Sequence, residues 1–283
     1  MTRIISGQAG SVRLTVPKRG TRPTSEKVRE AVFSALDSWG LTADTRVLDL
    51  YAGSGSLGLE AVSRGAREVT LVERHESAAL TLRKNAKAVR HSFAQGSLNR
   101  GAAGNSVPQI ECVRMSVKSF LSMLSKEATT QHSTTTHKAV SGADADTAAG
   151  SVAKTETTHR ERAASSHADL AFHQAREGKQ LSTARKSAKQ GSPNQLSEGS
   201  DSADRAPTAK PNVFDVVFID PPYELPNHEL VETLTALAPH LASDAAVMVE
   251  RDSRSPQPEW PEALHLVREK RYGETVVYWL EPR

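Results

Sequence analysis

A strand, a glycine turn and a helix follow one another within residues 46–60, and this order constrains the fold more than any other feature. An apolar run leads into a turn containing Gly53 and Gly55, which permit positive φ and let a ligand approach the backbone closely. Gly58 follows in the helical pattern, where a missing side chain lets a helix pack tightly on a strand. The segment predicts a parallel α/β unit with a ligand site at the helix N-terminus.

A second apolar run, residues 69–72, ends at Glu73. Glu73 lies about 20 residues after the first glycine, the spacing expected of an acid that binds ribose hydroxyls. The pattern does not choose its ligand, because a nicotinamide dinucleotide site has the same glycines and the same acid. Asp49, just before the turn, has two interpretations: it contacts the ligand, or it braces the glycine turn.

The segment Asp220-Pro221-Pro222-Tyr223 ends another apolar run, residues 216–219. Open α/β sheets bind ligands at the C-terminal ends of their strands, which is where we expect this segment to lie. Two prolines fix φ and remove two N–H donors. They leave a carboxylate, bare carbonyls and an aromatic ring, which suit a planar base held by its exocyclic amine. Taken alone, the tetrapeptide has a simpler interpretation as a turn that ends a strand.

Strand and helix patterns alternate along the chain, which implies a parallel sheet with right-handed crossovers. The expected elements are strands around Ile4 and Leu14, a helix from residue 24 or 25 to Gly40, the strand–turn–helix–strand unit above, a helix at 78–89, a loop at 94–108, a strand at 110–113, a helix at 117–124, a strand at 214–219, a helix at 229–241, a strand at 245–250, and a hairpin at 264–268 and 275–280.

Residues 127–211 differ from the rest of the chain in composition. They contain one aromatic residue, Phe172, and few large aliphatic side chains. Such a segment cannot bury enough apolar surface to offset its chain entropy, so we expect a disordered insertion. The expected organisation is an N-terminal basic β and helix extension at 1–40, one α/β domain at 41–126 and 212–283, and the low-complexity insertion at 127–211.

Motifs in both halves of the chain are similar to those of a known family. They are Asp49-x-x-Ala52-Gly53-Ser54-Gly55, Glu73 and Asp220-Pro221-Pro222-Tyr223, preceded by Arg3-Ile4-Ile5-Ser6-Gly7, Leu14-x-Val16-Pro17 and Arg22-Pro23-Thr24-x-x-x-Val28-Arg29-Glu30-Ala31-Val32-Phe33. The first set resembles class I S-adenosylmethionine-dependent methyltransferases that modify exocyclic amines. With the N-terminal set, the chain resembles the RsmD family of bacterial guanine-N2 methyltransferases of small-subunit ribosomal RNA.

The resemblance implies a Rossmann-like class I methyltransferase fold. Its sheet would have seven mostly parallel strands with helices on both faces, plus a small N-terminal β extension. It further implies methylation of the N2 amine of a guanine in 16S rRNA, at the guanine-966 site, by a protein acting as a monomer. The substrate is either naked RNA or RNA within an assembled or assembling small ribosomal subunit.

The cofactor implied by the resemblance is S-adenosylmethionine. The positions that match the family's cofactor motif are Asp49, Ala52, Gly53, Ser54, Gly55 and Glu73. We expect Gly53 and Gly55 to contact the methionine end and Glu73 to bind the ribose hydroxyls. In many methyltransferases of this class a third acid, after the third strand, accepts from the adenine amine. Here that position holds Ser116, a departure from the pattern.

The catalytic residues implied are Asp220, Pro221, Pro222 and Tyr223. A guanine amine is a weak nucleophile because its lone pair is delocalised into the ring. We expect Asp220 and the Pro221 carbonyl to accept its two N–H groups, so that the carboxylate stabilises positive charge growing on nitrogen. Tyr223 would stack on the base, which has to leave its stack or lie in an unpaired loop.

Positive charge is concentrated at the N-terminus, where residues 1–35 contain seven cations and two acids. A charge run is usually a solvated surface, but a basic arm ahead of a base-modifying site also suits phosphate contact. The candidate RNA contacts are Arg3, Arg13, Lys18, Arg19, Arg22, Thr24 and Arg29. Thr24 has a second interpretation as a helix cap.

Composition bounds the remaining alternatives. The single cysteine, Cys112, excludes an intrachain disulfide and lies in an apolar run, where a buried structural thiol is expected. No signal peptide or membrane span is evident, so we expect a cytoplasmic protein. The irregular spacing of the histidines at 127–211 argues against a metal site. There are three rival functions: a DNA amino-methyltransferase acting on adenine N6 or cytosine N4, a nicotinamide oxidoreductase, and a non-catalytic RNA-binding module, which fits the basic arm but not the glycine turn with its acid.

Overall fold

The computed structural model describes residues 2–16, 25–100, 108–135 and 213–283 of the 283-residue chain. The chain divides into two compact units, Met1–Leu124 with Ser202–Arg283, and Ser125–Asp201. The first unit contains both sheets, so the fold and the site below belong to it. In the second unit, the described residues are the C-terminal part of one helix.

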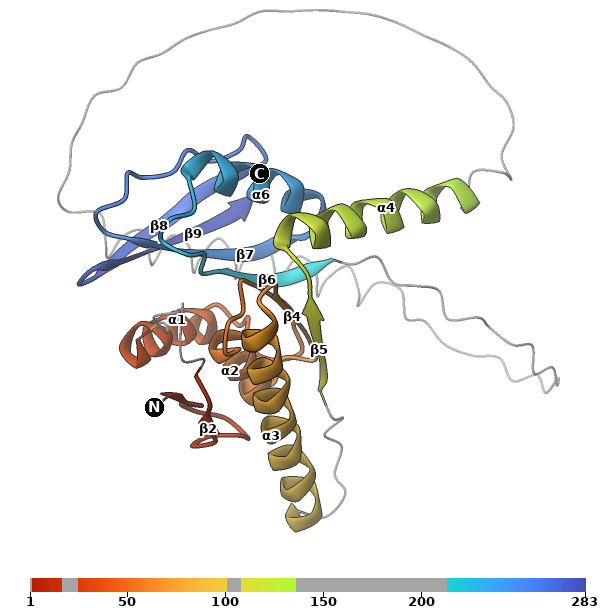
Figure 1. Cartoon of the computed structure of the whole chain (residues 1–283), viewed down its shortest axis with the longest axis vertical. Coiled ribbons are helices and arrows are strands. Elements are labelled where there is room, and N and C mark those ends of the chain that lie inside the picture. Colours follow the sequence, from red (N-terminus) through yellow and green to blue (C-terminus); the bar gives the residue numbers. More distant parts are fainter. Residues whose placement is uncertain (1, 17–24, 101–107, 136–212) are drawn as a thin grey trace, which may run out of the picture. The chain divides into compact units, whose positions relative to one another are not determined.

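A seven-stranded sheet forms the centre of the first unit, with strand order β5-β4-β3-β6-β7-β9-β8 (Figure 1). Strands β3 to β7 run parallel to one another, whereas β9 runs antiparallel to both β7 and β8. The predicted seven-stranded, mostly parallel sheet is therefore confirmed. Its strands are β3 Arg46–Leu50, β4 Glu68–Glu73, β5 Gln109–Arg114, β6 Phe214–Ile219, β7 Leu241–Asp252, β8 Leu264–Tyr272 and β9 Thr275–Pro282.

Strands β3 and β6 are neighbours in the middle of the sheet although they lie far apart in the sequence. Leu50, the last residue of β3, pairs with Ile219, the last residue of β6, and on its other side with Val72 of β4. The chain therefore leaves β3, β4 and β6 at one edge of the sheet. This register brings the glycine turn and the Asp220 segment to the same edge.

Helices cover both faces of the sheet. Successive strand residues point to opposite sides, and because both sets are largely apolar and buried, each face packs against helices. On one face, strand residues such as Leu50 and Val217 pack in one core cluster with residues of α4 and α6. On the other face, Phe218 contacts the ring of Phe33 from α1, at 5.6 Å between centroids. The helices are α1 Glu26–Ser38, α2 Ser56–Arg64, α3 Glu76–Arg100, α4 Val117–Thr135 and α6 Asn227–Leu237, with a 3₁₀ turn, η2, at Ala238–His240.

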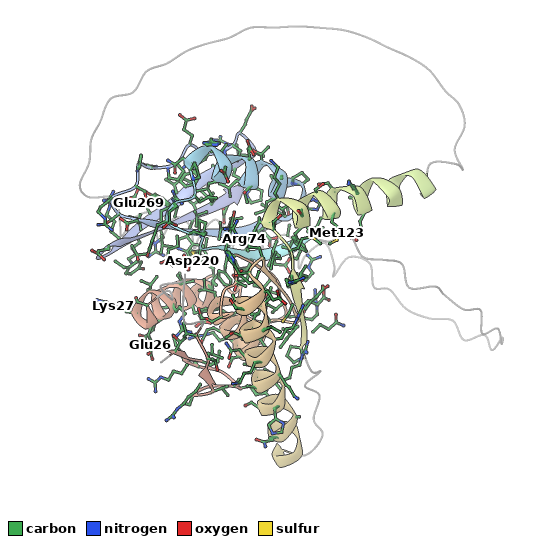
Figure 2. All side chains as sticks on the ribbon, viewed as in Figure 1. Glu26, Lys27, Arg74, Met123, Asp220 and Glu269 are labelled. Atoms are coloured by element: carbon green, nitrogen blue, oxygen red, sulfur yellow. The ribbon has the colours of Figure 1, made fainter. Side chains whose placement is uncertain are left out.

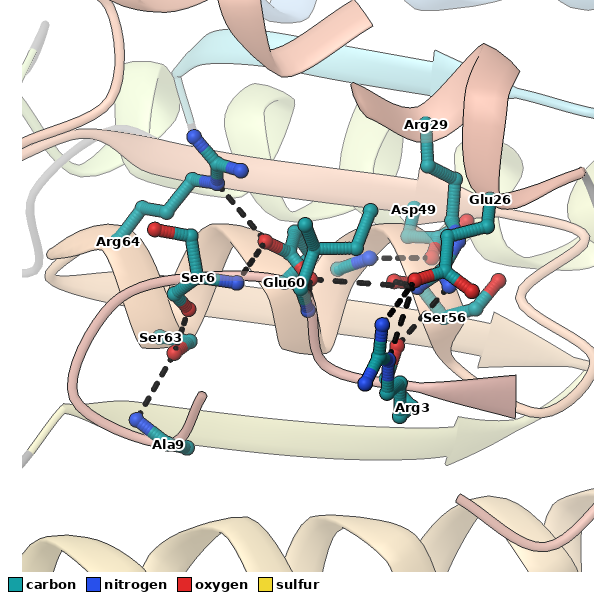
Figure 3. Close-up of polar contacts among 12 residues, drawn as sticks. Arg3, Ser6, Ala9, Glu26, Arg29, Asp49, Ser56, Glu60, Ser63 and Arg64 are labelled. Carbon is teal, nitrogen blue, oxygen red and sulfur yellow. Dashed lines mark hydrogen bonds and ion pairs between the residues drawn. The ribbon is translucent and has the colours of Figure 1, made fainter. Parts of the chain in front are cut away.

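The N-terminal extension is a two-stranded antiparallel sheet, β1 Thr2–Arg3 and β2 Arg13–Leu14, as predicted. The loop between these strands is fixed to α2 by the buried carboxylate of Glu60, which accepts from the backbone N–H of Ile5 at 2.7 Å and of Ser6 at 3.0 Å (Figure 3). Gly7 has φ +84°, and a Cβ there would lie 1.9 Å from the Ser63 carbonyl oxygen. Only glycine permits this close approach.

Two helices are longer than the sequence predicted. Helix α3 continues to Arg100, through part of the loop expected at 94–108. Helix α4 continues to Thr135, so the boundary placed at residue 127 falls inside a helix. Once a helix is nucleated, each added residue gains a hydrogen bond, and a weak apolar pattern does not end it. The rest of the predicted loop, 101–107, and of the predicted insertion, 136–211, lies outside the described residues.

Cys112 is half-buried in β5, and burial raises the pKa of its thiol above the ordinary value. Within the described part of the chain, no three His, Cys, Asp or Glu side chains are grouped in a way that could hold a metal ion. None of the helices described here combines the length and the apolar composition needed to cross a bilayer.

Candidate active site

A cavity of about 770 Å³ opens at the sheet edge where β3, β4 and β6 end. It brings together two motifs that the sequence separates by more than 160 residues, the glycine turn and the Asp220 segment. Arg74 and Asp220, both of which line the cavity, are labelled in Figure 2. Among the predicted site residues, those lining it are Ala52, Gly53, Ser54, Glu73, Ser116, Asp220, Pro221, Pro222 and Tyr223.

The glycine turn begins with residues in the left-handed region. Tyr51 has φ +67° and Gly53 has φ +55°. The N–H of Ala52 donates to the Val72 carbonyl at 2.9 Å, which holds the start of the turn against β4. Positive φ strains a tyrosine, and such strain tends to occur at functional sites.

Glu73 occupies the cavity wall at the end of β4 and is 6% exposed. One oxygen of its carboxylate accepts from the N–H of Gly53 at 2.9 Å, and the other accepts from the N–H of His75 at 2.7 Å. Each carboxylate oxygen has two lone pairs, so capacity remains on both oxygens for a ligand hydroxyl. The two bonds fix the carboxylate on the cavity wall, and its binding of ribose hydroxyls stays a prediction.

Gly55 and Gly58 serve packing and do not line the cavity. A Cβ on Gly55 would lie 2.5 Å from Leu82 Cδ1 of α3, so this glycine faces a helix, in contrast to the ligand contact predicted for it. A Cβ on Gly58 would lie 2.2 Å from Leu71 Cδ2 of β4. The predicted tight packing of α2 on a strand at Gly58 is confirmed.

Asp49 is 2% exposed and lies outside the lining of the cavity. Its Oδ2 accepts from the N–H of Gly58 at 2.9 Å, a contact that matches the bracing interpretation. Burial raises the pKa of Asp49 to about 8, the Gly58 hydrogen bond opposes this, and the charges of Asp220 and Glu73 add to the rise. At neutral pH the Asp49 carboxyl is therefore mostly protonated.

The tetrapeptide after β6 combines buried and exposed groups. Asp220 is partly buried and Pro221 is buried, whereas Pro222 and Tyr223 are exposed. Tyr223 is 41% exposed, one of two large hydrophobic side chains in the described residues that stand out in this way. A carboxylate on the wall can accept hydrogen bonds, and an exposed aromatic ring at the rim can stack on a flat ligand.

Ser116 lies on the cavity wall at the start of α4. Its Oγ accepts from the N–H of Ser119 at 3.1 Å and donates to Ser119 Oγ at 2.8 Å. The side chain therefore caps the helix. Its lone-pair capacity is partly used by this cap, and the position presents a hydroxyl to the cavity.

Arg29 is not an RNA contact, contrary to the sequence-based expectation. It is 1% exposed, and its Nη2 donates to the Arg3 carbonyl at 2.9 Å. Its guanidinium lies 4.0 Å from the Glu60 carboxylate, inside the cluster drawn in Figure 3. The side chain joins α1, α2 and the N-terminal strand, so it cannot reach an external phosphate.

Two of the other candidate RNA contacts are exposed, and four lie outside the described residues. Arg3 is exposed and forms an ion pair with Glu26 at 3.0 Å. Arg13 is exposed. The remaining candidates lie outside the described residues: Lys18, Arg19, Arg22 and Thr24.

Several cavity residues were not predicted from the sequence. Tyr51 lines the cavity and its hydroxyl hydrogen-bonds the side chain of Thr233 on α6; burial is the main cause that raises its pKa. Arg74, His75 and Lys118 also line it. An aromatic residue between a buried strand and the glycine turn was the available signal for Tyr51. For Thr233 there was none, since its place depends on how α6 docks.

Comparison with known proteins agrees with this architecture. A model of the family described as Conserved hypothetical protein 95 matches residues 2–112 and 146–281, most of the chain. Ribosomal RNA small subunit methyltransferase D of Escherichia coli strain K12 is 45% identical over 84 residues, which cover 29% of this chain and 41% of that protein. The chain thus spans about two fifths of the length of this curated relative.

Two solved structures share the fold. A hypothetical protein of Thermus thermophilus aligns with a TM-score of 0.56 at 19% identity, covering 99% of both chains. The yhhF protein of Escherichia coli, provisionally described as a methyltransferase, aligns with a TM-score of 0.53 at 23% identity, covering 99% of this chain and 97% of that one. From the family match, the chain belongs to the Conserved hypothetical protein 95 family, the RsmD family that its motifs resemble, and it has the class I methyltransferase fold.

Proposed function

We propose that this chain methylates the exocyclic N2 amine of a guanine in the RNA of the small ribosomal subunit, with S-adenosylmethionine as the donor. One observation carries the proposal: a single cavity is lined both by the glycine turn with Glu73 and by the Asp220 segment. The name of the Escherichia coli relative, a ribosomal RNA methyltransferase, supports ribosomal RNA as the substrate. The resemblance to the RsmD family supports the guanine-966 site.

The residues present fit the cofactor. A cavity of about 770 Å³ is within the range of roughly 300–1,000 Å³ typical of small-molecule sites. The backbone of residues 52–54 would hold the methionine end, and the Glu73 carboxylate would accept from the ribose hydroxyls. Ser116 and the first N–H groups of α4 would contact the adenine. When bound, the cofactor supplies an electrophilic methyl group on a sulfonium, whose bonding pair stays on the sulfur.

Asp220 and the Pro221 carbonyl would accept the two N–H groups of the guanine amine. These two hydrogen bonds would point the nitrogen lone pair at the methyl group and hold the reacting atoms close to the geometry of attack. Positive charge grows on nitrogen as its bond to carbon forms, and the fixed Asp220 carboxylate stabilises that charge. The amine then loses one proton, which Asp220 is placed to accept. Prolines at 221 and 222 keep this acceptor edge free of competing N–H donors.

Tyr223 would stack on the target base and set its plane. Its ring is 41% exposed at the cavity rim, so it can contact a base without prior rearrangement. A base reaching this position has to be unpaired or flipped out of its stack. The proposed substrate is therefore a single-stranded or extruded guanine, either in free RNA or in an assembling subunit.

The test is mass mapping of small-subunit RNA from cells with and without this gene. Deletion should remove one N2-methylguanine, the wild-type gene should restore it, and Asp220→Asn should not. Because Asn keeps the shape of Asp220 but not its charge, the variant should still bind S-adenosylmethionine. RNA that is unchanged by the deletion would defeat the proposal. Equilibrium binding of S-adenosylmethionine and of NAD tests the oxidoreductase alternative, which predicts binding of NAD. Methyl transfer to DNA oligonucleotides tests the DNA methyltransferase alternative.

A further inference from the structure

Arg251 is a buried cation that lies directly behind the Asp220 segment. It lies near the C-terminal end of β7 and is 5% exposed. Its Nη2 donates to the Leu225 carbonyl at 2.8 Å and approaches Asn227 Oδ1 at 3.3 Å. The N–H of Leu225 in turn donates to the Pro222 carbonyl at 2.9 Å. Two hydrogen bonds thus connect this guanidinium to the proline turn.

The sheet register explains how Arg251 reaches this turn. Val249 of β7 pairs with Ile219, where β6 ends, so β7 continues beyond its neighbour. Arg251 therefore lies level with the residues that follow β6, with Val276 of β9 opposite it on the other side. Asn227 donates from Nδ2 to the Pro256 carbonyl at 3.1 Å, which holds the far end of the same turn.

The guanidinium is incompletely paired. Its Nε and Nη1 are buried and have no hydrogen-bond partner. The adjacent carboxylate of Asp252 forms a fork with Arg254, at 2.9 Å to Nη2, and the remaining electrostatic neighbours of Arg251 are Tyr278 and Tyr51. Burial is the main effect on this group, and it lowers the pKa of Arg251.

An incompletely paired, buried cation is a poor source of stability. Replacement of buried charges by apolar side chains of similar volume is often neutral or stabilising. Unpaired buried N–H donors add a further penalty. A residue that stability alone does not explain, in direct contact with a catalytic turn, indicates a functional role.

We propose that Arg251 is a positioning residue that holds the Pro222–Leu225 turn, and through it Asp220 and Tyr223, in the geometry that methyl transfer requires. The inference rests on the proposed function. Arg251 itself is absent from the cavity lining, so we expect no direct contact between it and the cofactor or the base. Its loss should therefore impair the chemical step and leave cofactor binding intact. A misplacement of about 1 Å can lower a rate by about a hundredfold.

The test compares Arg251→Met with Arg46→Met. Arg46 is also partly buried but pairs with Asp215, at 2.8 Å, where β3 and β6 begin, and it does not line the cavity. Arg251→Met should lower kcat on small-subunit RNA by about tenfold to a hundredfold, with unchanged dissociation constants for S-adenosylmethionine and an unchanged or higher Tm. Arg46→Met should lower Tm and leave kcat unchanged.

Hydrogen exchange provides a readout that needs no catalysis. The Leu225 amide should exchange faster in Arg251→Met and at the wild-type rate in Arg46→Met. Wild-type kcat with unaltered exchange in Arg251→Met would overturn the inference. So would a joint loss of Tm, cofactor binding and kcat, which describes a merely structural residue. If the wild-type protein methylates no RNA, the proposed function fails, and the exchange result still decides whether Arg251 holds the turn.

Discussion

At the scale of single residues, the buried carboxyl of Asp49 makes the free energy of unfolding depend on pH. Its carboxyl has a pKa of about 8 in the folded protein, against an ordinary value of 3.8. Folding therefore takes up a proton at pH values between these two numbers. The contribution of Asp49 to the free energy of unfolding is fully present below pH 3.8 and is lost as the pH rises toward 8.

Asp49→Asn should remove this dependence. The free energy of unfolding of the variant, relative to wild type, should rise from about pH 4 to about pH 8 and stay constant above that, with a total change on the order of a few kcal/mol. Urea unfolding at a series of pH values measures it. Asp220→Asn should narrow the pH range over which Asp49 affects stability, because the Asp220 charge helps to raise the pKa of Asp49. A difference in free energy of unfolding between variant and wild type that does not vary with pH would contradict the raised pKa of Asp49.

Gly55 and Gly273 form a matched pair for measuring crowding at the turn. Both have positive φ, +80° and +63°, but a Cβ on Gly55 would lie 2.5 Å from Leu82 Cδ1, whereas a Cβ on Gly273 would meet nothing within 4 Å. Alanine at either position has the backbone penalty of the left-handed region, about 1–2 kcal/mol. Gly55→Ala should lose about 1–3 kcal/mol more from overpacking. Equal losses in the free energy of unfolding, measured with urea, would show that the Leu82 side chain moves aside without destabilising the protein.

Two arginines show what a residue's type does and does not predict. Arg29 belongs to a basic run, and sequence reasoning expected it on the surface. Its burial depends on Glu60, whose 0% exposure results from the docking of the N-terminal loop on α2. Arg251 had no motif to mark it, because its importance arises from β7 extending past β6. Partners brought together by tertiary packing decide such roles, and local patterns do not contain them.

At the scale of elements, the N-terminal extension depends on one carboxylate. Glu60 accepts from Ile5 and Ser6, binds Arg64 Nε at 2.8 Å, and lies 4.0 Å from Arg29. A carboxamide has only one acceptor oxygen and no charge. Replacement by glutamine would therefore leave a backbone N–H and a buried guanidinium without their partner.

Glu60→Gln should lower the free energy of unfolding by about 3–5 kcal/mol. The Ile5 and Ser6 amides should exchange faster, since the loop would no longer be fixed to α2. Glu26→Gln is the control, because Glu26 pairs with Arg3 at the surface, where an ion pair is worth at most about 1 kcal/mol. Similar small effects for both variants would mean that the loop is held mainly by its backbone contacts to Ser63.

Element type followed from the sequence more readily than element ends. The helix predicted at 229–241 corresponds to α6, Asn227–Leu237, whose Leu230, Leu234 and Leu237 are fully buried. The ends of α3 and α4 were placed too early, because polar composition after residues 94 and 127 was taken as the end of each helix. A helix whose last turns carry polar side chains has no stripe to read.

At the scale of the whole molecule, the cavity belongs to one unit. Every residue that lines it lies in Met1–Leu124 or Ser202–Arg283. The site was predictable in outline because parallel strands present their C-terminal ends at one edge, so two motifs that end strands had to meet if those strands were neighbours. That β6 lies beside β3 is a property of the family's topology and not of any local pattern.

Removal of residues 136–201 should leave the cavity and its chemistry intact. A flexible Gly/Ser linker in their place changes loop-closure entropy only slowly with length. We expect the shortened protein to bind S-adenosylmethionine with the wild-type dissociation constant and to methylate small-subunit RNA at the wild-type kcat. Titration calorimetry and a methyl-transfer assay measure the two. A variant that unfolds cooperatively and binds the cofactor but methylates nothing would assign the removed segment a part in RNA recognition.

The place of β6 between β3 and β7 has a consequence during synthesis. Arg46 and Asp215, which start the two paired strands, are 169 residues apart. At roughly 5–20 residues per second, a ribosome would need about 10–30 s to supply the partner after β3 has emerged. For that interval β3 can pair with β4 but its other side has no strand to pair with. We therefore expect the nascent polypeptide to depend on chaperones more than a chain with a shorter connection between these strands.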